Sequence, residues 1–238
     1  MSDKIITIGI QARSTSQRFP NKVHEKIGNK TILQRIIDTC KDAESYLNRY
    51  SHKNRYKVNT AVLCPVGDPI VKKYSGEVDI VQGPEHDVLS RYSNLADRFN
   101  SSYVVRVTAD CPLIPSYVIS SITMKAIYNN CDYASNVEPH CRTTPDGWDC
   151  EVFSASLLRY TDAQAKDKYD REHVTTWMRD NKKGWKHLIV VNHIDLSMHK
   201  LSVDTPEEYA RIVKEYESVQ NKLEVARSIV GSDNVHRL

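Results

Sequence analysis

The stretch GIQARSTSQRFPNKV, from Gly9 to Val23, determines how the rest of the chain is interpreted. It begins inside an Ile-rich apolar run, residues 4–10, which is typical of a buried strand. It continues as a loop without periodicity that carries Arg13, Arg18 and Lys22. In an open α/β sheet, ligands bind beyond the carboxyl ends of the strands. Guanidinium and ammonium groups in such a loop suit a polyanion, although a solvated basic loop would also explain this motif taken alone.

Apolar and amphipathic segments alternate through the first half of the chain. Strands are predicted at residues 4–10, 57–64, 78–81 and 103–108, and helices at 31–41, 68–74, 87–99 and 115–129. This alternation predicts an α/β fold with a mostly parallel sheet flanked by helices. Residues 42–56 are polar and rich in Tyr and Arg, and no regular element is predicted there.

The second half departs from this alternation. Short strands are predicted at 132–136 and 150–153, separated by an irregular loop at 137–149. Helices at 155–165 and 170–181, a strand at 186–192 and a helix at 206–218 follow. No repeat, low-complexity tract or Gly/Ser-rich linker is present, so residues 1–238 are predicted to form a single domain with a small β-containing elaboration in its second half.

Composition narrows the class of protein. Hydrophobic residues make up 40% and charged residues 26% of the chain, and the formal net charge is +3. Basic residues are spread out, which argues against nucleic acid as the main partner. The N-terminal apolar run is far too short to span a bilayer and no signal peptide is visible, so no membrane association is predicted. Six cysteines without a CxxC pair predict reduced thiols in a cytoplasmic protein.

Asp110 and Asp204 are the candidate metal ligands. Asp110 follows the predicted strand at 103–108, although capping of the next turn would also explain it. Asp204 precedes a complete helix start, in which Thr205 is the N-cap and Glu208 the third helical residue. The Asp204 carboxylate is therefore left free. Two carboxylates that reach one point suit Mg²⁺, which few protein oxygens hold together with phosphate and water.

Charged side chains of both signs also lie between Glu138 and Glu151 and at the start of the helix predicted at 170–181. The candidates for binding an anionic acceptor are Arg142, Asp149, Glu151, Arg171 and His173. Cations suit an acidic group, and carboxylates suit hydroxyls or amines. A solvated loop and an acidic first helical turn are the structural alternative. Zinc binding is not predicted, because the His and Cys residues of these segments lack a short paired spacing.

Several nucleotide-binding and catalytic motifs are absent. None of the eight glycines forms GxxxxGK(S/T) or GxGxxG, which argues against a P-loop kinase and a Rossmann dehydrogenase. No Asp-x-Asp occurs, which argues against a common type of metal-dependent glycosyltransferase, and GxSxG is missing too.

A series of short segments carries a family resemblance. The first comprises Gln11-Ala12-Arg13, Ser16, Arg18, Pro20 and Lys22. The series continues through residues 87–92 (DVLSRY), 105–114 (VRVTADCPLI), 145–153 (PDGWDCEVF), 170–174 (DREHV) and 202–208 (SVDTPEE). Together they resemble the CTP-dependent cytidylyltransferases, whose opening signature is QARxxSxRxPxK. That family includes the enzymes that activate 3-deoxy-manno-octulosonate and acylneuraminate, and the chain is most similar to the SpsF-like spore coat polysaccharide branch.

The resemblance implies a Rossmann-like nucleotidyltransferase sheet, CTP as the donor, Mg²⁺ as the cofactor and a homodimer. It implies that Arg13 and Lys22 hold the triphosphate and that Asp110 and Asp204 bind the metal, so these four are the implied catalytic residues. The residues that it assigns to CTP are Gln11, Ala12, Arg13, Ser16, Arg18, Lys22, Arg91, Arg106 and Asp110. The loop around Asp149 and Glu151 is assigned to the acceptor.

Two features depart from the family pattern. Residues 42–56 are longer than the usual connection and are interpreted as a surface or dimer insertion. Asn21 precedes Lys22, which reverses the order in the acylneuraminate enzymes and argues against acylneuraminate as the acceptor.

The expected reaction moves CMP from CTP to an anionic acceptor, which is an acidic sugar, a sugar phosphate or a phosphonate, and releases pyrophosphate. The expected role is surface polysaccharide or glycoconjugate biosynthesis. A nucleotide-sugar-dependent glycosyltransferase of the same fold is one alternative, and it would release a nucleoside phosphate. A non-catalytic nucleotide-binding module is another, but the presence of both Asp110 and Asp204 argues against it.

Overall fold

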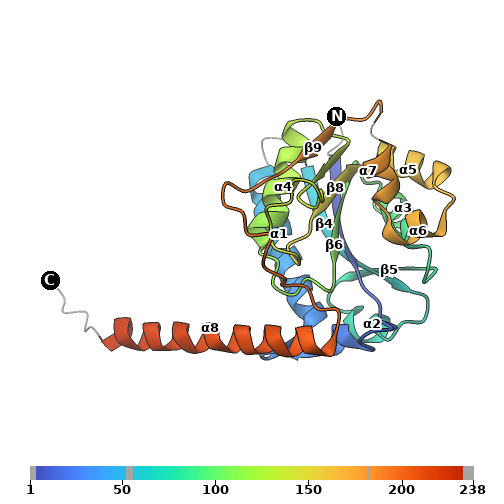
Figure 1. The fold of residues 1–238 in the computed structure, drawn as a ribbon. Helices are drawn as coiled ribbons and strands as arrows, with labels where there is room; N and C mark the ends of the chain where they lie inside the picture. The colour runs from blue at the N-terminus through green and yellow to red at the C-terminus, as the bar shows by residue number, and fades with distance from the viewer. Residues whose placement is uncertain (1–3, 52–55, 182, 233–238) are drawn as a thin grey trace.

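β1 (Lys4–Gln11) lies inside a seven-stranded sheet in a computed structural model that describes residues 4–51, 56–181 and 183–232. The strand order is β5-β4-β1-β6-β8-β7-β9 (Figure 1). The other six strands are β4 (Tyr56–Pro65), β5 (Asp79–Gly83), β6 (Tyr103–Thr108), β7 (Tyr133–Ser135), β8 (Glu151–Ser154) and β9 (His187–Ile189).

The strand directions confirm the predicted mostly parallel sheet. β1 is parallel to β4 and β6, and β4 is parallel to β5. β8 is antiparallel to its neighbours β6 and β7, whereas β9 is parallel to β7. The strands of the second half thus extend the main sheet. A two-stranded sheet of β2 (Lys26–Ile27) and β3 (Lys30–Thr31) lies apart from it, in the first half of the chain.

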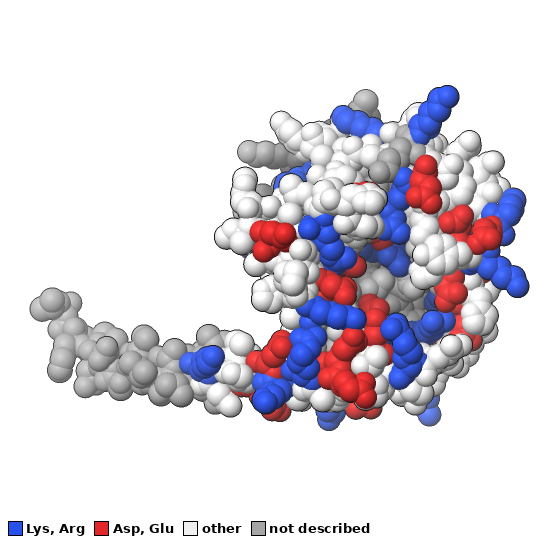
Figure 2. Space-filling model, viewed as in Figure 1, with Lys and Arg blue, Asp and Glu red and all other residues white. Residues whose placement is uncertain are grey.

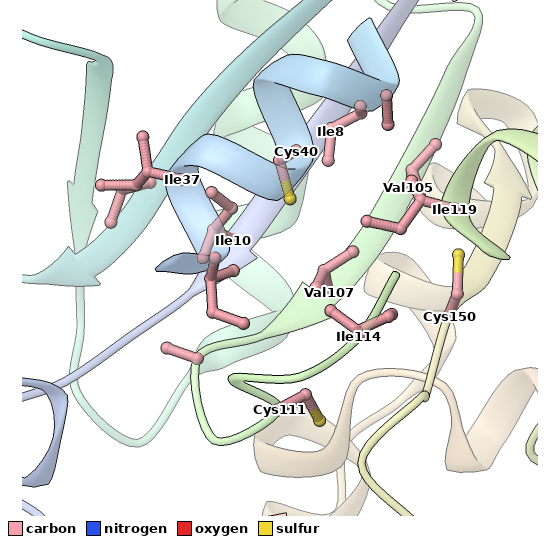
Figure 3. Close-up of a cluster of buried hydrophobic side chains, with 14 of the residues drawn as sticks. Ile8, Ile10, Ile37, Cys40, Val105, Val107, Cys111, Ile114, Ile119 and Cys150 are labelled. Carbon is pink, nitrogen blue, oxygen red and sulfur yellow. The ribbon is translucent and has the colours of Figure 1, made fainter. Parts of the chain in front are cut away.

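α1 (Ile32–Ser51) and α4 (Ser116–Tyr128) cover one face of the sheet (Figure 1). Alternate residues of β1 bury their side chains on this face because side chains along a strand point to opposite sides. Figure 3 shows Ile8 and Ile10 of β1 beside Cys40 of α1 and Val107 of β6. This apolar layer holds β1 and β6 in place, so their carboxyl ends form a rigid platform.

α3 (Val88–Arg98) and α5 (Ala155–Gln164) pack against the opposite face. Asp87 caps α3 as predicted, since its side chain accepts a hydrogen bond from the backbone N–H of Ser90. Gly9 of β1 lets α3 approach closely: a Cβ there would lie 2.8 Å from side-chain atoms of Leu63 and Tyr92. Gly9, two residues before the Gln11-Ala12-Arg13 motif, therefore serves helix packing.

Three of the predicted helices differ from their predicted bounds by more than two residues at one end or are interrupted. α1 continues to Ser51 because Ala43 and Leu47 extend its buried face beyond the predicted end at residue 41. Most of the polar stretch at 42–56 is therefore helical, and residues 52–55 lie outside the described residues. The helix predicted at 170–181 is two helices, α6 (Lys168–His173) and α7 (Thr176–Asp180). They are separated at Val174, whose φ of 65° no α-helix accommodates.

α8 (Pro206–Ser232) is also longer than predicted. Its first turns pack Ile212 against Ile27, Ile32 and Val203, and its later turns extend past the sheet and its helices (Figure 1). The two remaining short helices are η1 (Lys22–His24) and α2 (Ile70–Tyr74). Within the described ranges, no helix is both long enough and apolar enough to cross a membrane.

Candidate active site

The carboxyl ends of β1 and β6 open into a polar cavity of about 420 Å³. Figure 2 shows Lys and Arg side chains alternating with Asp and Glu side chains around a hollow of this face. The residues that line the polar cavity are Gln11, Ala12, Arg13, Ser16, Gln17, Arg18, Lys22, Val23, Val88, Arg91, Arg106, Thr108, Ala109, Asp110, Glu172, His173 and Asp204. All nine residues that the resemblance assigns to CTP, and all four implied catalytic residues, are in this set.

Two other hollows lie elsewhere. An apolar one of about 280 Å³ lies between α1 and α4 at the opposite end of β1, and none of the predicted site residues lines it. A third, of about 610 Å³, includes Tyr169 and Asp170 of α6, whereas Glu172 and His173 of the same helix line the polar cavity. α6 is therefore shared between the polar cavity and the third hollow.

The loop after β1 is held by a buried carboxylate. Asp68 accepts hydrogen bonds from the backbone N–H of Ser14 at 2.8 Å and from its hydroxyl at 2.6 Å. The loop then closes on itself, because the N–H of Asn21 donates to the Ser14 carbonyl at 2.9 Å. Asn21 has a left-handed conformation with φ 60°, which Asn tolerates better than most residues. The order Asn21-Lys22 thus starts η1 and aims Lys22 into the polar cavity.

Lys22 lies between the two candidate metal ligands. Its Nζ is 3.0 Å from Asp204 Oδ1 and 3.9 Å from Asp110 Oδ2, and its side chain is only 12% exposed. Arg18 approaches the same oxygen of Asp204 at 3.1 Å. Burial raises the pKa of the Asp204 carboxyl, but the charges of Lys22 and Arg18 outweigh it and leave the pKa below its ordinary value. Asp204 is therefore ionised at neutral pH.

The local backbone explains why both carboxylates point into the cavity. The N–H of Val203 donates to the carbonyl of Asp110 at 2.8 Å, which joins the end of β6 to the segment before α8. The Thr205 hydroxyl accepts from the N–H of Glu208. The Glu208 carboxylate accepts in return from the N–H of Thr205 at 3.2 Å and from the N–H of Asp204 at 2.7 Å. This is the predicted capping box, and it leaves the Asp204 side chain free to reach Lys22.

The donor set suits a divalent ion such as Mg²⁺. Asp110 and Asp204 supply hard carboxylate oxygens and both remain partly exposed in the cavity, at 32% and 21%. In the described part of the chain, no three His, Cys, Asp or Glu side chains are grouped as a metal site. Two protein carboxylates leave most coordination positions to phosphate and water, which matches the way in which Mg²⁺ is usually held.

Arg91 is a buried cation on the cavity wall. It is 1% exposed, and its guanidinium makes only long hydrogen bonds, both 3.4 Å, to the carbonyls of Leu63 and Glu85. Its Nε has no hydrogen-bond partner among the described residues. Burial lowers the pKa of Arg91. Gly83 makes room for it, because a Cβ there would lie 2.6 Å from the Arg91 side chain. A buried guanidinium with spare donors favours a ligand rich in acceptor atoms.

The residues assigned to the acceptor are mostly engaged by other protein groups. Arg142 pairs with Asp149 and donates to the carbonyls of Thr144 and Pro145. Arg171 is held by Asp87 at 2.9 Å and by Asp162 at 2.7 Å. Of the five predicted acceptor residues, His173 alone lines the polar cavity.

Glu151 lies outside the cavity lining. Its side chain is 2% exposed and is bonded to Arg106 and Tyr133. This burial argues against direct contact between Glu151 and an acceptor.

Sequence reasoning missed some residues of the site. Asp68 anchors the first loop, but the sequence pattern placed it only at the start of the helix predicted at 68–74. Glu172 lines the cavity with its carboxylate 3.6 Å from Arg13, and only its place in the DREHV segment pointed to it. Gln17 and Thr108 are further lining residues, and both lie inside segments that carry the family resemblance.

Comparison with known proteins agrees with this geometry. A family model described as Cytidylyltransferase matches residues 7–229. The chain belongs to the cytidylyltransferase family. It is therefore a nucleotidyltransferase, and the predicted family is confirmed.

Curated relatives of this cytidylyltransferase span most of its length. An uncharacterised protein of Methanocaldococcus jannaschii is 30% identical over 87% of the chain and 80% of its own length. The spore coat polysaccharide biosynthesis protein SpsF of Bacillus subtilis is 24% identical over 92% of the chain and 89% of its own length. A 3-deoxy-manno-octulosonate cytidylyltransferase of Solibacter usitatus is 26% identical over 54% of the chain and 47% of its own length.

Solved structures place the fold in the same group. A cytidylyltransferase of Leptospira borgpetersenii has a TM-score of 0.76 and 26% identity, with 98% of this chain and 99% of that chain covered. A CMP:2-keto-3-deoxy-manno-octonic acid synthetase complexed with CTP has a TM-score of 0.67 and 12% identity, with 90% and 99% covered. The Rossmann-like nucleotidyltransferase fold is therefore confirmed.

Proposed function

We propose that this cytidylyltransferase transfers CMP from CTP to an anionic acceptor and releases pyrophosphate. The acceptor is an acidic sugar, a sugar phosphate or a phosphonate, and the product serves surface polysaccharide or glycoconjugate synthesis. The observation that carries the proposal is the meeting of Lys22, Asp110 and Asp204 in the polar cavity. The likeness to SpsF and to a 3-deoxy-manno-octulosonate cytidylyltransferase supports the acceptor class.

The cations of the first loop are assigned to the triphosphate. Arg13, Arg18 and Lys22 all line the polar cavity, and the Asp68 anchor holds their loop against β1. Attack of an acceptor oxygen on the α-phosphorus needs the reacting atoms to be held in line and the developing charge to be neutralised. These cations would stabilise negative charge on the departing pyrophosphate.

Asp110 and Asp204 are assigned to Mg²⁺. When bound, the ion would polarise the α-phosphate and lower the pKa of an acceptor hydroxyl. Lys22 would neutralise a phosphate oxygen beside the two carboxylates, and the distances of 3.0 Å and 3.9 Å from its Nζ to Asp204 and Asp110 support this role. His173 and Glu172 of α6 face the same cavity and are the candidates for acceptor contacts.

The test is a pyrophosphate-release screen. Each nucleoside triphosphate is combined with Mg²⁺ and with panels of acidic sugars, sugar phosphates and phosphonates. We expect release with CTP and one class of acceptor, and little release with the other triphosphates. Release of a nucleoside phosphate from a nucleotide sugar would support a glycosyltransferase instead. CTP-dependent stabilisation without turnover on any panel would support a binding module, and either result contradicts the proposal.

We also propose that the enzyme acts as a homodimer in the cytoplasm, by the same family resemblance. Light scattering at micromolar concentration measures the assembly directly. A monomeric mass at concentrations where the enzyme is fully active would contradict the dimer.

A further inference from the structure

Four side chains from four adjacent strands form a hydrogen-bonded row that leads from the buried interior to the polar cavity. The hydroxyl of Tyr133 in β7 donates to Glu151 Oε1 in β8 at 2.5 Å. Arg106 of β6 donates from Nη1 to the other oxygen of Glu151. Arg106 also donates from Nε to Gln11 Oε1, at the end of β1, at 3.3 Å. The row therefore crosses the sheet from β7 to β1.

Strand register produces this row. Arg106 and Glu151 are directly opposite each other in the antiparallel pair of β6 and β8, where facing side chains are close enough to interact. Glu151 faces Ser135 of β7, which places Tyr133 diagonally across from it. Because each pairing is set by backbone hydrogen bonds, the row is as rigid as the sheet.

The two ends of the row differ in their access to a ligand. Gln11 and Arg106 line the polar cavity, and the Arg106 side chain is 14% exposed. Glu151 is 2% exposed and Tyr133 is fully buried, so neither reaches the cavity. Any effect of Glu151 on a bound substrate must pass through Arg106.

Glu151 and Tyr133 each keep one protonation state at neutral pH. Burial raises the pKa of Glu151, but Arg106, Tyr133 and Thr175 outweigh burial and keep the pKa below its ordinary value. Burial and Glu151 raise the pKa of Tyr133, so its hydroxyl stays a donor. Arg106 is paired with the buried carboxylate of Glu151, so the pair adds little net charge to the cavity. The pair therefore suits hydrogen bonding to a neutral group better than it suits holding a phosphate.

The row also orients the Gln11 amide. Its carbonyl oxygen accepts from Arg106, and a guanidinium has no acceptor that could hold the amide the other way round. The NH₂ group of Gln11 is thus left as the donor on the cavity side. Gln11 and the spare N–H groups of Arg106 together offer only donors to a ligand.

We propose that Glu151 is a positioning residue that fixes Arg106 and, through it, Gln11 as donors to neutral oxygen or nitrogen atoms of a substrate. This role replaces the direct acceptor contact that the sequence predicted for Glu151. The inference rests on the proposed function, since it takes the polar cavity as the CTP site. Such neutral acceptor atoms occur on the cytosine ring and on the hydroxyls of a sugar, and kinetics can distinguish the two.

The test uses Glu151→Gln, which keeps the shape of the side chain and removes its charge. We expect kcat/KM in the pyrophosphate-release assay to fall by up to about 10²-fold, the scale of a displaced active-site group. A raised KM for CTP with weaker discrimination against UTP identifies the cytosine ring as the ligand. A raised KM for the acceptor identifies the sugar. Unchanged kcat and KM for both substrates would overturn the proposal.

A double-mutant cycle tests whether Glu151 acts through Arg106. In an Arg106→Gln background, Glu151→Gln should cause little further loss, because the residue through which it acts is gone. If the losses in kcat/KM that the two single substitutions cause multiply in the double variant, the proposal is overturned. Tyr133→Phe removes one hydrogen bond from Glu151 and should cause a smaller loss of kcat/KM of the same kind. If Glu151→Gln fails to fold, Tyr133→Phe takes its place in the test.

Two controls distinguish a positioning role of Glu151 from an effect on the stability of the fold. Glu77→Gln makes the same change at an exposed position and should behave as wild type. A lower melting temperature for Glu151→Gln with wild-type kinetic constants would mean a merely structural role and would overturn the proposal. If the wild type releases no pyrophosphate with CTP, the proposed function fails. Calorimetric CTP binding then tests the row on its own, and equal affinities of wild type and Glu151→Gln would overturn it too.

Discussion

At the scale of single residues, the contacts of Lys22 support nucleotidyl transfer. Its ammonium donates to the carbonyl of Val203 at 2.8 Å and to Asp204 at 3.0 Å, and Asp110 lies 3.9 Å away. A mostly buried ammonium needs compensating acceptors, and two carboxylates supply them. The same two carboxylates repel each other unless a cation lies between them. Under the proposed function, Lys22 and a metal ion held by the two carboxylates would bring positive charge to the triphosphate.

Replacing either acid should remove most of the activity. We expect Asp204→Asn and Asp110→Asn each to lower kcat by roughly 10²–10³-fold or more, because each removes charge that stabilises the transition state. Pyrophosphate release measures the loss. Asp42→Asn on the exposed side of α1 is the matched control and should leave kcat unchanged. Near-normal turnover in Asp204→Asn would refute its assignment to the metal.

Asp149 should make the stability of the protein depend on pH. Burial raises its pKa to about 6, although Arg142 opposes the shift. Between its ordinary pKa of 3.8 and about 6, the native state binds more protons than the unfolded state, so stability falls as pH rises through this window. The penalty is complete above pH 6 and amounts to no more than about 3 kcal/mol.

Asp149→Asn tests this dependence by removing the ionisation. Relative to wild type, the variant should be more stable at pH 7 than at pH 4, as measured by denaturant unfolding at both values. Asp146→Asn, at a neighbouring and more exposed carboxylate, should show a smaller change. A difference between variant and wild type that does not vary with pH would contradict the assignment.

At the scale of elements, the segment before α8 depends on its contact with the loop before β8. The N–H of Asp146 donates to the His199 carbonyl at 2.9 Å, and Asp146 forms a β-bridge with Lys200. Gly147 has φ +104°, and a Cβ there would lie 2.5 Å from backbone atoms of Leu201 and Ser202. Only glycine allows this approach, which holds the segment that presents Asp204.

Gly147→Ala should therefore lower both stability and activity. The left-handed backbone costs about 1–2 kcal/mol for a residue with a Cβ, and the backbone clash adds about 1–3 kcal/mol. Gly67→Ala is a matched control, because Gly67 also has a positive φ, of +77°, but its Cβ would meet nothing within 4 Å. Unfolding curves and kcat should show the larger loss in Gly147→Ala. Equal losses of stability and kcat in Gly147→Ala and Gly67→Ala would rule out a clash between the new Cβ at position 147 and the backbone of Leu201 and Ser202.

At the scale of the whole molecule, the polar cavity joins segments from both ends of the chain. Lys22 and Asp204 are 182 positions apart. They meet because β1 and β6 are parallel neighbours whose carboxyl ends share one edge, and because the N–H of Val203 donates to the carbonyl of Asp110 just after β6. A ligand that contacts the first loop, β6, α6 and the segment before α8 at once should stabilise the fold as a unit.

CTP with Mg²⁺ should raise the melting temperature. At a concentration about 100 times Kd, the stabilisation is about 2.7 kcal/mol, or roughly 5–10 °C for a chain of this length. Arg13→Ala should lower the affinity for CTP, which calorimetry measures directly, and should reduce the thermal shift. The exposed cation Arg49 on α1 is the control position. An unchanged CTP affinity in Arg13→Ala would contradict the role of the first loop.

Local patterns accounted for much of the fold and part of the site. The strand at β6, the Asp87 cap and the capping box at Thr205 were predictable because each depends on side chains a few positions apart. The continuation of α1 to Ser51 was not, because Tyr- and Arg-rich residues surround the buried Ala43 and Leu47. The break at Val174 was not predictable either, since a β-branched residue with φ 65° opposes its own local preference and is held by burial in the core.

The order of strands and helices, the first loop and the family resemblance were determined by the sequence alone, because periodicity and motifs are written in neighbouring residues. Tertiary structure alone decided that Asp110 and Asp204 both reach Lys22, and that Glu151 lies buried behind Arg106. Those arrangements depend on strand register and sheet order, which bring distant residues together through backbone pairing that no local pattern encodes.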